Sequence, residues 1–185
     1  MSTWRHLRAA LLLPGSVTIL IPALILWSSD SVEVGWGLAS PLGLLAAIAG
    51  LALIAGGAAL WYRTVALFAR IGEGTLAPWD PTQRLVVAGP YRYVRNPMIT
   101  AVLAVLLGEA ALFGSGSVLI LAGSFLAVNA IWFPLVEEPG LERRFGDDYL
   151  AYKRNVPRWL PSLRPWDPPP GDAPVLPTGD AHDLR

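Results

Sequence analysis

Four long apolar runs constrain this 185-residue chain more than any other feature. A helix needs about 20 mostly apolar residues to cross the hydrocarbon core of a bilayer. The runs that reach or approach this length are residues 9–29, 38–62, 98–113 and 117–136. The chain is 54% hydrophobic and 15% charged, which is too apolar for an ordinary soluble domain. The sequence therefore predicts an all-α integral membrane protein with about four transmembrane helices.

The lysines and arginines indicate how these helices are oriented. All 14 fall on one side of a four-span topology: in the N-terminal stub, in the loop before the third run, or after the fourth. Cytoplasmic loops carry an excess of these residues, so both termini are expected in the cytoplasm. The first run, behind Arg5 and Arg8, is interpreted as a retained helix because it is long and no clear cleavage site follows; a removed signal peptide is the alternative. A composition low in Lys and rich in Ala, Leu, Gly and Arg favours the cytoplasmic membrane of a bacterium with GC-rich DNA.

Small residues mark two features of the apolar region. Gly114-Ser115-Gly116 separates the third and fourth runs and predicts a tight, antiparallel helical hairpin. In the second run, small residues recur at a spacing that lets helices approach closely in lipid, or that is simply Ala/Gly filler. These pairs are Gly43 and Ala47, Ala46 and Gly50, and Ala52 and Gly56.

The chain divides into two parts by composition. Residues 1–164 are predicted to form the membrane domain, and the proline-rich residues 165–185 are predicted to be disordered because their composition supports no packed core.

The first polar motif, G-P-Y-R-Y-V-R-N-P, occupies residues 89–97 directly before the third run. Gly89-Pro90-Tyr91 predicts a turn. Arg92 and Arg95 share a face if this stretch is helical. Asn96 is placed to cap the third membrane helix, and Pro97 suits its first turn. The two arginines beside a helix N-terminus fit either a headgroup anchor or an anion site.

The second motif begins with Glu137 and Glu138 at the end of the fourth run. A helix C-terminus and anionic headgroups both disfavour carboxylates there, so these two either have a cationic or hydrogen-bonding partner or are solvated. Downstream, apolar and aromatic residues at spacings of four, four and three predict an amphipathic interfacial helix that is interrupted at Gly146 and ended by Pro157 and Pro161. These residues are Leu141, Phe145, Tyr149 and Tyr152.

Some chemistry is excluded by composition. The chain has no cysteine, and its two histidines, His6 and His182, lie near the termini, so no metal site or serine–histidine triad is expected. Nucleic acid is not an expected partner. Glu109 lies about 16 Å into the third run, near the bilayer midplane. It is either a functional carboxylate or one that is protonated or bonded to a neighbour such as Asn129.

Together the two motifs resemble those of the membrane methyltransferase family that includes isoprenylcysteine carboxyl methyltransferases and bacterial phospholipid methyltransferases. The second motif is similar to the family's E-E-x-x-L-x-x-x-F-G-x-x-Y-x-x-Y-x-x-x-V-P-R pattern with its spacing intact. The resemblance covers residues 84–161, under half of the chain. Asn96 stands where many members have histidine, and Ile99 where many have tyrosine.

The resemblance implies methyl transfer from S-adenosylmethionine to a lipophilic acceptor of isoprenoid, prenyl-carboxylate or phospholipid type at the cytoplasmic face. A carboxylate acceptor needs only an orienting cation, whereas an amine or hydroxyl needs a base such as Glu138 or Tyr91. A nicotinamide-dependent lipid or steroid reductase and a non-catalytic membrane protein are the alternatives. The cofactor-binding residues carried over from the family are Gly89, Tyr91, Arg95, Asn96, Pro97, Glu137 and Glu138, and the catalytic candidates are Arg95, Arg158 and Glu138.

Overall fold

A computed structural model of the chain describes residues 15–29, 32–71 and 85–168. Every regular element in these residues is helical, which confirms the predicted all-α class. In chain order they are η1 (Ser16–Leu20), α2 (Ile21–Ser28), η2 (Val34–Gly37), α3 (Leu42–Ile71), η3 (Gly89–Arg92), α4 (Pro97–Phe113), α5 (Gly116–Trp132), η4 (Phe133–Glu137) and α6 (Glu138–Asn155).

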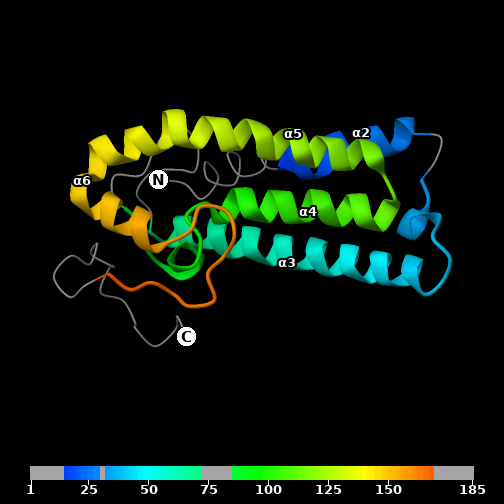
Figure 1. Cartoon of the computed structure of the whole chain (residues 1–185), viewed down its shortest axis with the longest axis horizontal. Coiled ribbons are helices and arrows are strands. Elements are labelled where there is room, and N and C mark those ends of the chain that lie inside the picture. Colours follow the sequence, from blue (N-terminus) through cyan, green and yellow to red (C-terminus); the bar gives the residue numbers. More distant parts are fainter. Residues whose placement is uncertain (1–14, 30–31, 72–84, 169–185) are drawn as a thin grey trace.

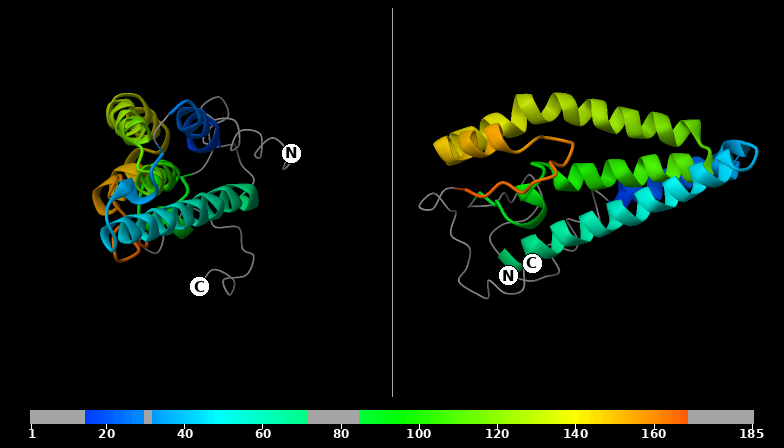
Figure 2. Two further views of the ribbon diagram at one scale, coloured as in Figure 1. Left: turned by 90° about the vertical axis from the view of Figure 1, so that its right-hand side faces the viewer. Right: turned by 60° about the horizontal axis from the view of Figure 1, so that its bottom comes forward.

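Helix α4 lies at the centre of an elongated bundle. Figure 1 shows α3 along one side of it, and α5 and α2 along the other. Beyond α5 the helical path bends through the π-helical turn η4, which contains Pro134, and continues into α6. Proline and π-helical turns are common causes of such bends. Figure 2 shows that α6 and the segment after it cover the end of the bundle where α4 begins.

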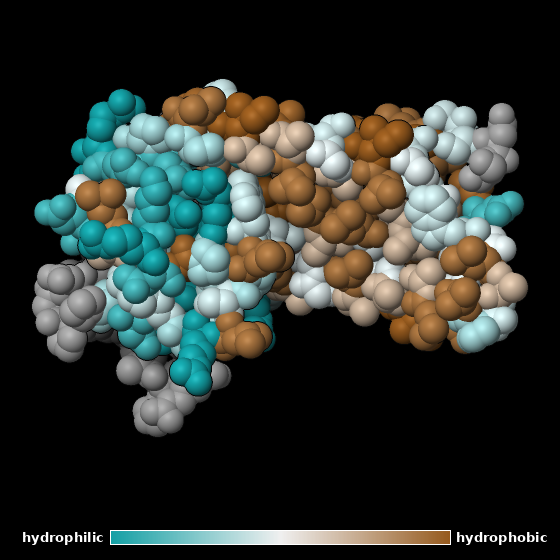
Figure 3. Space-filling model, in the orientation of Figure 1, coloured by the Kyte–Doolittle hydropathy of each residue, from teal (hydrophilic) through white to brown (hydrophobic). Residues whose placement is uncertain are grey.

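The bundle has an apolar body and one polar end. Figure 3 shows hydrophobic residues over most of its length and hydrophilic ones gathered around α6. Large apolar side chains on the outer faces of α3 and α5 are exposed, an arrangement that suits lipid better than water. They include Leu44, Leu45, Leu51, Ile120 and Val128.

Two helical segments of the described residues are long and apolar enough to cross a membrane: Leu42–Leu67 and Gly116–Asn155, the apolar part of which ends at Val136. Ser16–Ser28 and Pro97–Phe113 are apolar but shorter. The helices therefore follow the four apolar runs, and the count of four spans stays a prediction. The beginning of the first run, up to residue 14, lies outside the described residues.

Helices α3 and α4 approach closely at glycines. A Cβ atom on Gly108 would lie 2.6 Å from the carbonyl oxygen of Gly50, and one on Gly57 would lie 2.8 Å from that of Ala101. The predicted role of Gly50 in close packing agrees with this contact. The pairing of Ala52 with Gly56 does not, because Gly56 faces open space on another side of α3.

The predicted hairpin between α4 and α5 is confirmed. Gly114 ends α4 in the left-handed conformation, with a φ of 60°, which favours glycine. Ser115 caps α5, because its hydroxyl accepts a hydrogen bond from the amide of Val118 at 3.3 Å.

Glu109 lies in the second half of α4, towards this hairpin, and its depth near the bilayer midplane stays a prediction. It is four residues, or about 6 Å, from the end of α4 at Phe113. Its Oε2 atom is buried and accepts no hydrogen bond from the described residues. The Asn129 side chain instead donates to the carbonyl of Phe125 at 2.8 Å.

Candidate functional site

The first motif forms a turn that leads directly into α4. Gly89 has a φ of +52° and is the first residue of the 3₁₀ turn η3. Pro97 occupies the first turn of α4, as predicted. Asn96 occupies the N-cap position, but its side chain makes no capping hydrogen bond; its carbonyl accepts from the amide of Thr100 at 3.0 Å. Asn96 therefore stands at the predicted N-cap position of α4, but its side chain does not cap the helix.

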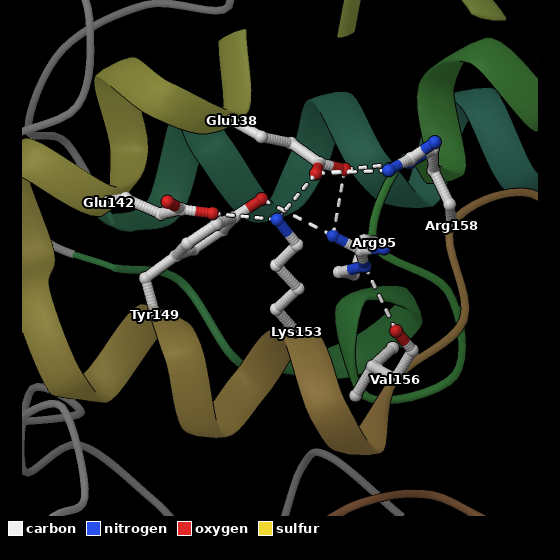
Figure 4. A network of polar contacts seen from close by, with 7 residues as sticks. All are labelled: Arg95, Glu138, Glu142, Tyr149, Lys153, Val156 and Arg158. Carbon is white, nitrogen blue, oxygen red and sulfur yellow. Dashed lines mark hydrogen bonds and ion pairs between the residues drawn. The ribbon is translucent and has the colours of Figure 1, made fainter. Parts of the chain in front are cut away.

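Glu138 is the centre of the polar network at this end of the bundle (Figure 4). Its side chain is 2% exposed, and three cations contact it. Arg95 donates to Oε1 at 2.9 Å, and Arg158 donates to Oε1 at 2.6 Å and to Oε2 at 3.0 Å. The ammonium of Lys153 lies 3.1 Å from Oε2 and 2.6 Å from Glu142. The carboxylate thus joins the first motif, α6 and the segment beyond α6.

These contacts determine the protonation state of Glu138. Burial opposes its ionisation, but the hydrogen bonds from Arg158 and Lys153 and the charge of Arg95 outweigh burial and hold the pKa of this carboxyl below its usual value. Hydrogen bonds to Glu142 and Glu138 raise the pKa of Lys153. Glu138 and Lys153 are therefore both charged at neutral pH.

Arg95 is the most deeply placed of the cations, with a side chain that is 9% exposed. Besides Glu138 it donates through Nε to the carbonyl of Val156 at 3.0 Å and through Nη1 to the Tyr149 hydroxyl at 3.4 Å. Its backbone amide donates to the carbonyl of Pro157 at 2.8 Å. A single residue of the first motif thereby holds the chain that leaves α6.

Residues 156–168, here called the C-terminal strap, run back over the first motif toward the start of α4 (Figures 1 and 2). The amide of Ser162 donates to the carbonyl of Tyr93, and that of Trp166 to the carbonyl of Arg92, both at 2.9 Å. Arg92 also pairs with Asp167. Arg92 and Arg95 therefore point to different partners instead of sharing one face. Trp166 and Asp167 belong to the stretch that the sequence assigns to the tail, whereas residues 169–185 lie outside the described residues.

The apolar face of α6 packs as its spacing predicts. Tyr149 and Tyr152 are buried with Val87 and Val156, and partly buried Leu85, Leu141, Phe145 and Trp166 surround them. The Tyr152 hydroxyl donates to the carbonyl of Tyr91 at 2.7 Å. The predicted interruption is a kink at Gly146, which has a φ of 54°.

Glu137 differs from its neighbour because its side chain is exposed, at the last residue of η4. It lies close enough to the first motif to act on Tyr91: burial raises the pKa of the Tyr91 hydroxyl, and the charge of Glu137 raises it further. Tyr91 therefore stays protonated at neutral pH.

The structure brings the predicted catalytic candidates into direct contact, since Arg95 and Arg158 both bind Glu138. Gly89, Tyr91, Asn96 and Pro97 lie on the segment that contains Arg95. The sequence did not point to Lys153 and Glu142, whose contact spans 11 residues. A straight helix separates such residues by about 16 Å along its axis. They meet because α6 is kinked at Gly146. The glycine that interrupts the helical spacing of apolar residues was therefore the sequence signal for this contact.

An apolar groove of the described surface is lined by residues of α2 and includes none of these side chains, so we place no chemistry there. The residues that line it are Ile21, Leu24, Ile25, Trp27 and Ser28.

An apolar helical body with a charged end that holds a buried ion-pair network defines a helical protein associated with a membrane. The chain matches the family model of the phospholipid methyltransferases over residues 45–148, more than half of its length. The protein belongs to this family, as its motifs predicted. The match includes Arg95 and Glu138 and ends before Tyr149. No curated protein and no solved structure matches the chain. Membership of the family indicates methyltransferase activity on a lipid-type substrate.

Proposed function

We propose that this protein is an integral membrane enzyme that transfers a methyl group from S-adenosylmethionine to a lipophilic acceptor at the polar end of the bundle. In this proposal the chain crosses a bacterial membrane four times, and both termini and the polar end lie on the cytoplasmic side. Residues 1–164 are its membrane domain, and residues 84–161 are its cofactor and catalytic region.

One observation carries the proposal. Two motifs separated by the α4–α5 hairpin meet in a single buried network, in a chain that belongs to a family of lipid methyltransferases. A site at this end borders both the hydrophilic end and the apolar body of the molecule (Figure 3), which suits a soluble cofactor and a lipid acceptor.

The residues present suit the polar groups of S-adenosylmethionine. The exposed carboxylate of Glu137 is available to an amino group or to ribose hydroxyls. The network around Glu138 contains three cations, Arg95, Lys153 and Arg158, and two carboxylates, Glu138 and Glu142, so it has one positive charge in excess. That excess suits an anionic group such as the cofactor's carboxylate. Gly89, Tyr91, Asn96 and Pro97 are the proposed lining on the side of the first motif.

Glu138 has a different role in this scheme from Glu137. Its two oxygens are already occupied by three cations. We therefore assign it the task of holding Arg95 and Arg158 in place, so that their guanidinium groups are fixed before a ligand arrives. Fixed charges of this kind stabilise a reacting complex without reorganisation.

Neither of the two candidate bases, Glu138 and Tyr91, suits proton removal, and Glu137, whose pKa is raised by partial burial, is assigned to the cofactor in this scheme. S-adenosylmethionine supplies an electrophilic methyl group on a sulfonium that departs as a neutral thioether. The lowered pKa of Glu138 makes it a weak base, and the raised pKa of Tyr91 keeps that hydroxyl protonated. A lipid carboxylate, oriented by Arg95 or Arg158, attacks without losing a proton. A methyl ester of a lipophilic acid is therefore the product that we expect.

The experiment uses the purified protein in lipid vesicles with methyl-tritiated S-adenosylmethionine and, in separate reactions, prenyl carboxylates, isoprenoid alcohols and phosphatidylethanolamine. We expect label in the organic phase with the carboxylates, and its release as methanol in alkali, which cleaves methyl esters but leaves N-methyl groups intact. Glu137→Gln should abolish transfer. Alkali-stable label would refute the carboxylate acceptor, and no transfer to any lipid by folded protein would refute the proposed activity.

A further inference from the structure

The C-terminal strap exposes two large apolar side chains at the polar end of the molecule. Leu160 is 81% exposed and Leu163 is 99% exposed. Both lie in a short stretch that is otherwise tied to the first motif by backbone hydrogen bonds. Single exposed leucines are common on protein surfaces, so what these two contact depends on where the strap lies relative to the apolar body.

The depth of the strap follows from its contacts with two helices. The hydroxyl of Thr100 donates to the carbonyl of Trp159 at 2.9 Å, and the rings of Phe133 and Trp159 meet edge to face with centroids 5.4 Å apart. Thr100 lies about 4.5 Å inside the start of α4 at Pro97, and Phe133 lies at the other end of the π-helical turn from Glu137. Trp159 therefore sits below the charged ends of both helices, within the level of the apolar body.

We place this level at the border between the hydrocarbon core and the interfacial zone of a bilayer, where the apolar body of the bundle ends. The zone between hydrocarbon and water is about 5–7 Å thick on each side, and tryptophan is enriched in it. Leu160 follows Trp159 directly and shares its level. Leu163 is next to Ser162, which bonds to Tyr93 outside α4, so Leu163 lies nearer the headgroups.

The charges around the two leucines suit the same surface. The exposed Arg164 follows Leu163, whereas Arg158, which precedes Trp159, is already paired with Glu138. Basic residues beside an apolar insertion are attracted to anionic headgroups.

We propose that the strap docks on the membrane in which the bundle is embedded, with Leu160 inserted among the acyl chains and Leu163 at headgroup level of the leaflet at the polar end. The proposal depends on the membrane location of the bundle and not on the methyl-transfer activity. Because Arg158 is bonded to Glu138 and adjoins Trp159, docking of the strap also holds Arg158 in place beside the lipid.

The absence of cysteine from the chain allows a direct test. Leu160→Cys, Leu163→Cys and the control Asp147→Cys, an exposed position on α6, each create one labelling site in the full-length protein. Each variant is labelled with an environment-sensitive fluorophore and reconstituted in vesicles of phosphatidylcholine and phosphatidylglycerol. Quenching is measured with lipids that carry a nitroxide at a shallow or a deep acyl position, and with a water-soluble quencher.

We expect lipid-borne quenching at position 160 to be several-fold stronger than at position 147, quenching at 163 only by the shallow nitroxide, and a dominant response to the aqueous quencher at 147. Aqueous quenching at 160 equal to that at 147 would overturn the proposal, because the strap would then face water. A label at 160 that neither quencher reaches would also overturn it, since another part of the chain or a second copy would then cover the leucines.

Discussion

Replacement of Glu138 by Gln is expected to loosen the polar end of the bundle strongly. The amide cannot accept hydrogen bonds at both terminal atoms, so its NH₂ group faces donors of Arg158 and Lys153, or Arg95 loses its acceptor. Removing one partner of a buried ion pair costs about 3–5 kcal/mol. Arg158 and Lys153 are 27% and 35% exposed and can turn toward water, so we expect the lower limit, about 3 kcal/mol.

Hydrogen exchange of the purified protein in detergent measures this loss where it arises. The amides of Arg95, Ser162 and Trp166 form the hydrogen bonds between the strap and the first motif. A local opening that is easier by about 3 kcal/mol accelerates their exchange about 100-fold. Amides in the middle of α4 should change much less, because the glycine contacts with α3 do not involve Glu138.

Glu142→Gln is the matched control. Glu142 is 35% exposed and pairs with Lys153 at the rim of the network, so its replacement should cost less than about 1 kcal/mol. Exchange at the strap amides that is equally slow in Glu138→Gln, in Glu142→Gln and in the wild type would refute the view that Glu138 holds this end together.

Three further outcomes follow from the contacts. Gly108→Ala places a methyl group against the carbonyl of Gly50, which should destabilise the fold by about 1–3 kcal/mol and lower the thermal midpoint in detergent. Gly56→Ala is the control, because its methyl group meets open space and should leave the midpoint unchanged. Equal midpoints for the two variants would contradict the close packing of α3 and α4. Acid should weaken the polar end, because the pKa of Glu138 is lower in the folded protein than in the unfolded chain. The contribution of Glu138 to folding stability is therefore complete above the unfolded pKa of about 4.3 and is lost as the pH falls further. The difference in thermal midpoint between the wild type and Glu138→Gln should shrink between about pH 5 and 3. Arg92→Gln breaks an exposed ion pair and should cost less than about 1 kcal/mol in denaturant titration; a larger loss would give Arg92 a role that its contacts do not explain.

Features set by local chemistry were predictable from the sequence. The hairpin at Gly114 and Ser115, the position of Pro97 in the first turn of α4, and the buried stripe through Tyr149 and Tyr152 all depend on turn residues or on helical periodicity within one segment. Such signals need no knowledge of what lies across the fold.

Features set by contacts between distant segments were not predictable. The sequence left Glu138 either partnered or solvated, and it could not choose Arg95, which is 43 residues away, or Arg158, which is 20 residues away. Likewise, the choice of Gly50 over Gly56 for close packing depends on which side of α3 meets α4. The kink at Gly146 was visible as an interruption, but its consequence, the contact between Lys153 and Glu142, requires the folded geometry.

The most direct test of the central claim is calorimetric titration of the detergent-purified protein with S-adenosylmethionine, with NADPH as the control ligand and Glu137→Gln as the matched variant. We predict saturable binding of S-adenosylmethionine alone, lost in Glu137→Gln while the thermal midpoint of that variant stays near that of the wild type. Binding of NADPH instead, or no binding of S-adenosylmethionine by folded protein, would contradict the proposed activity.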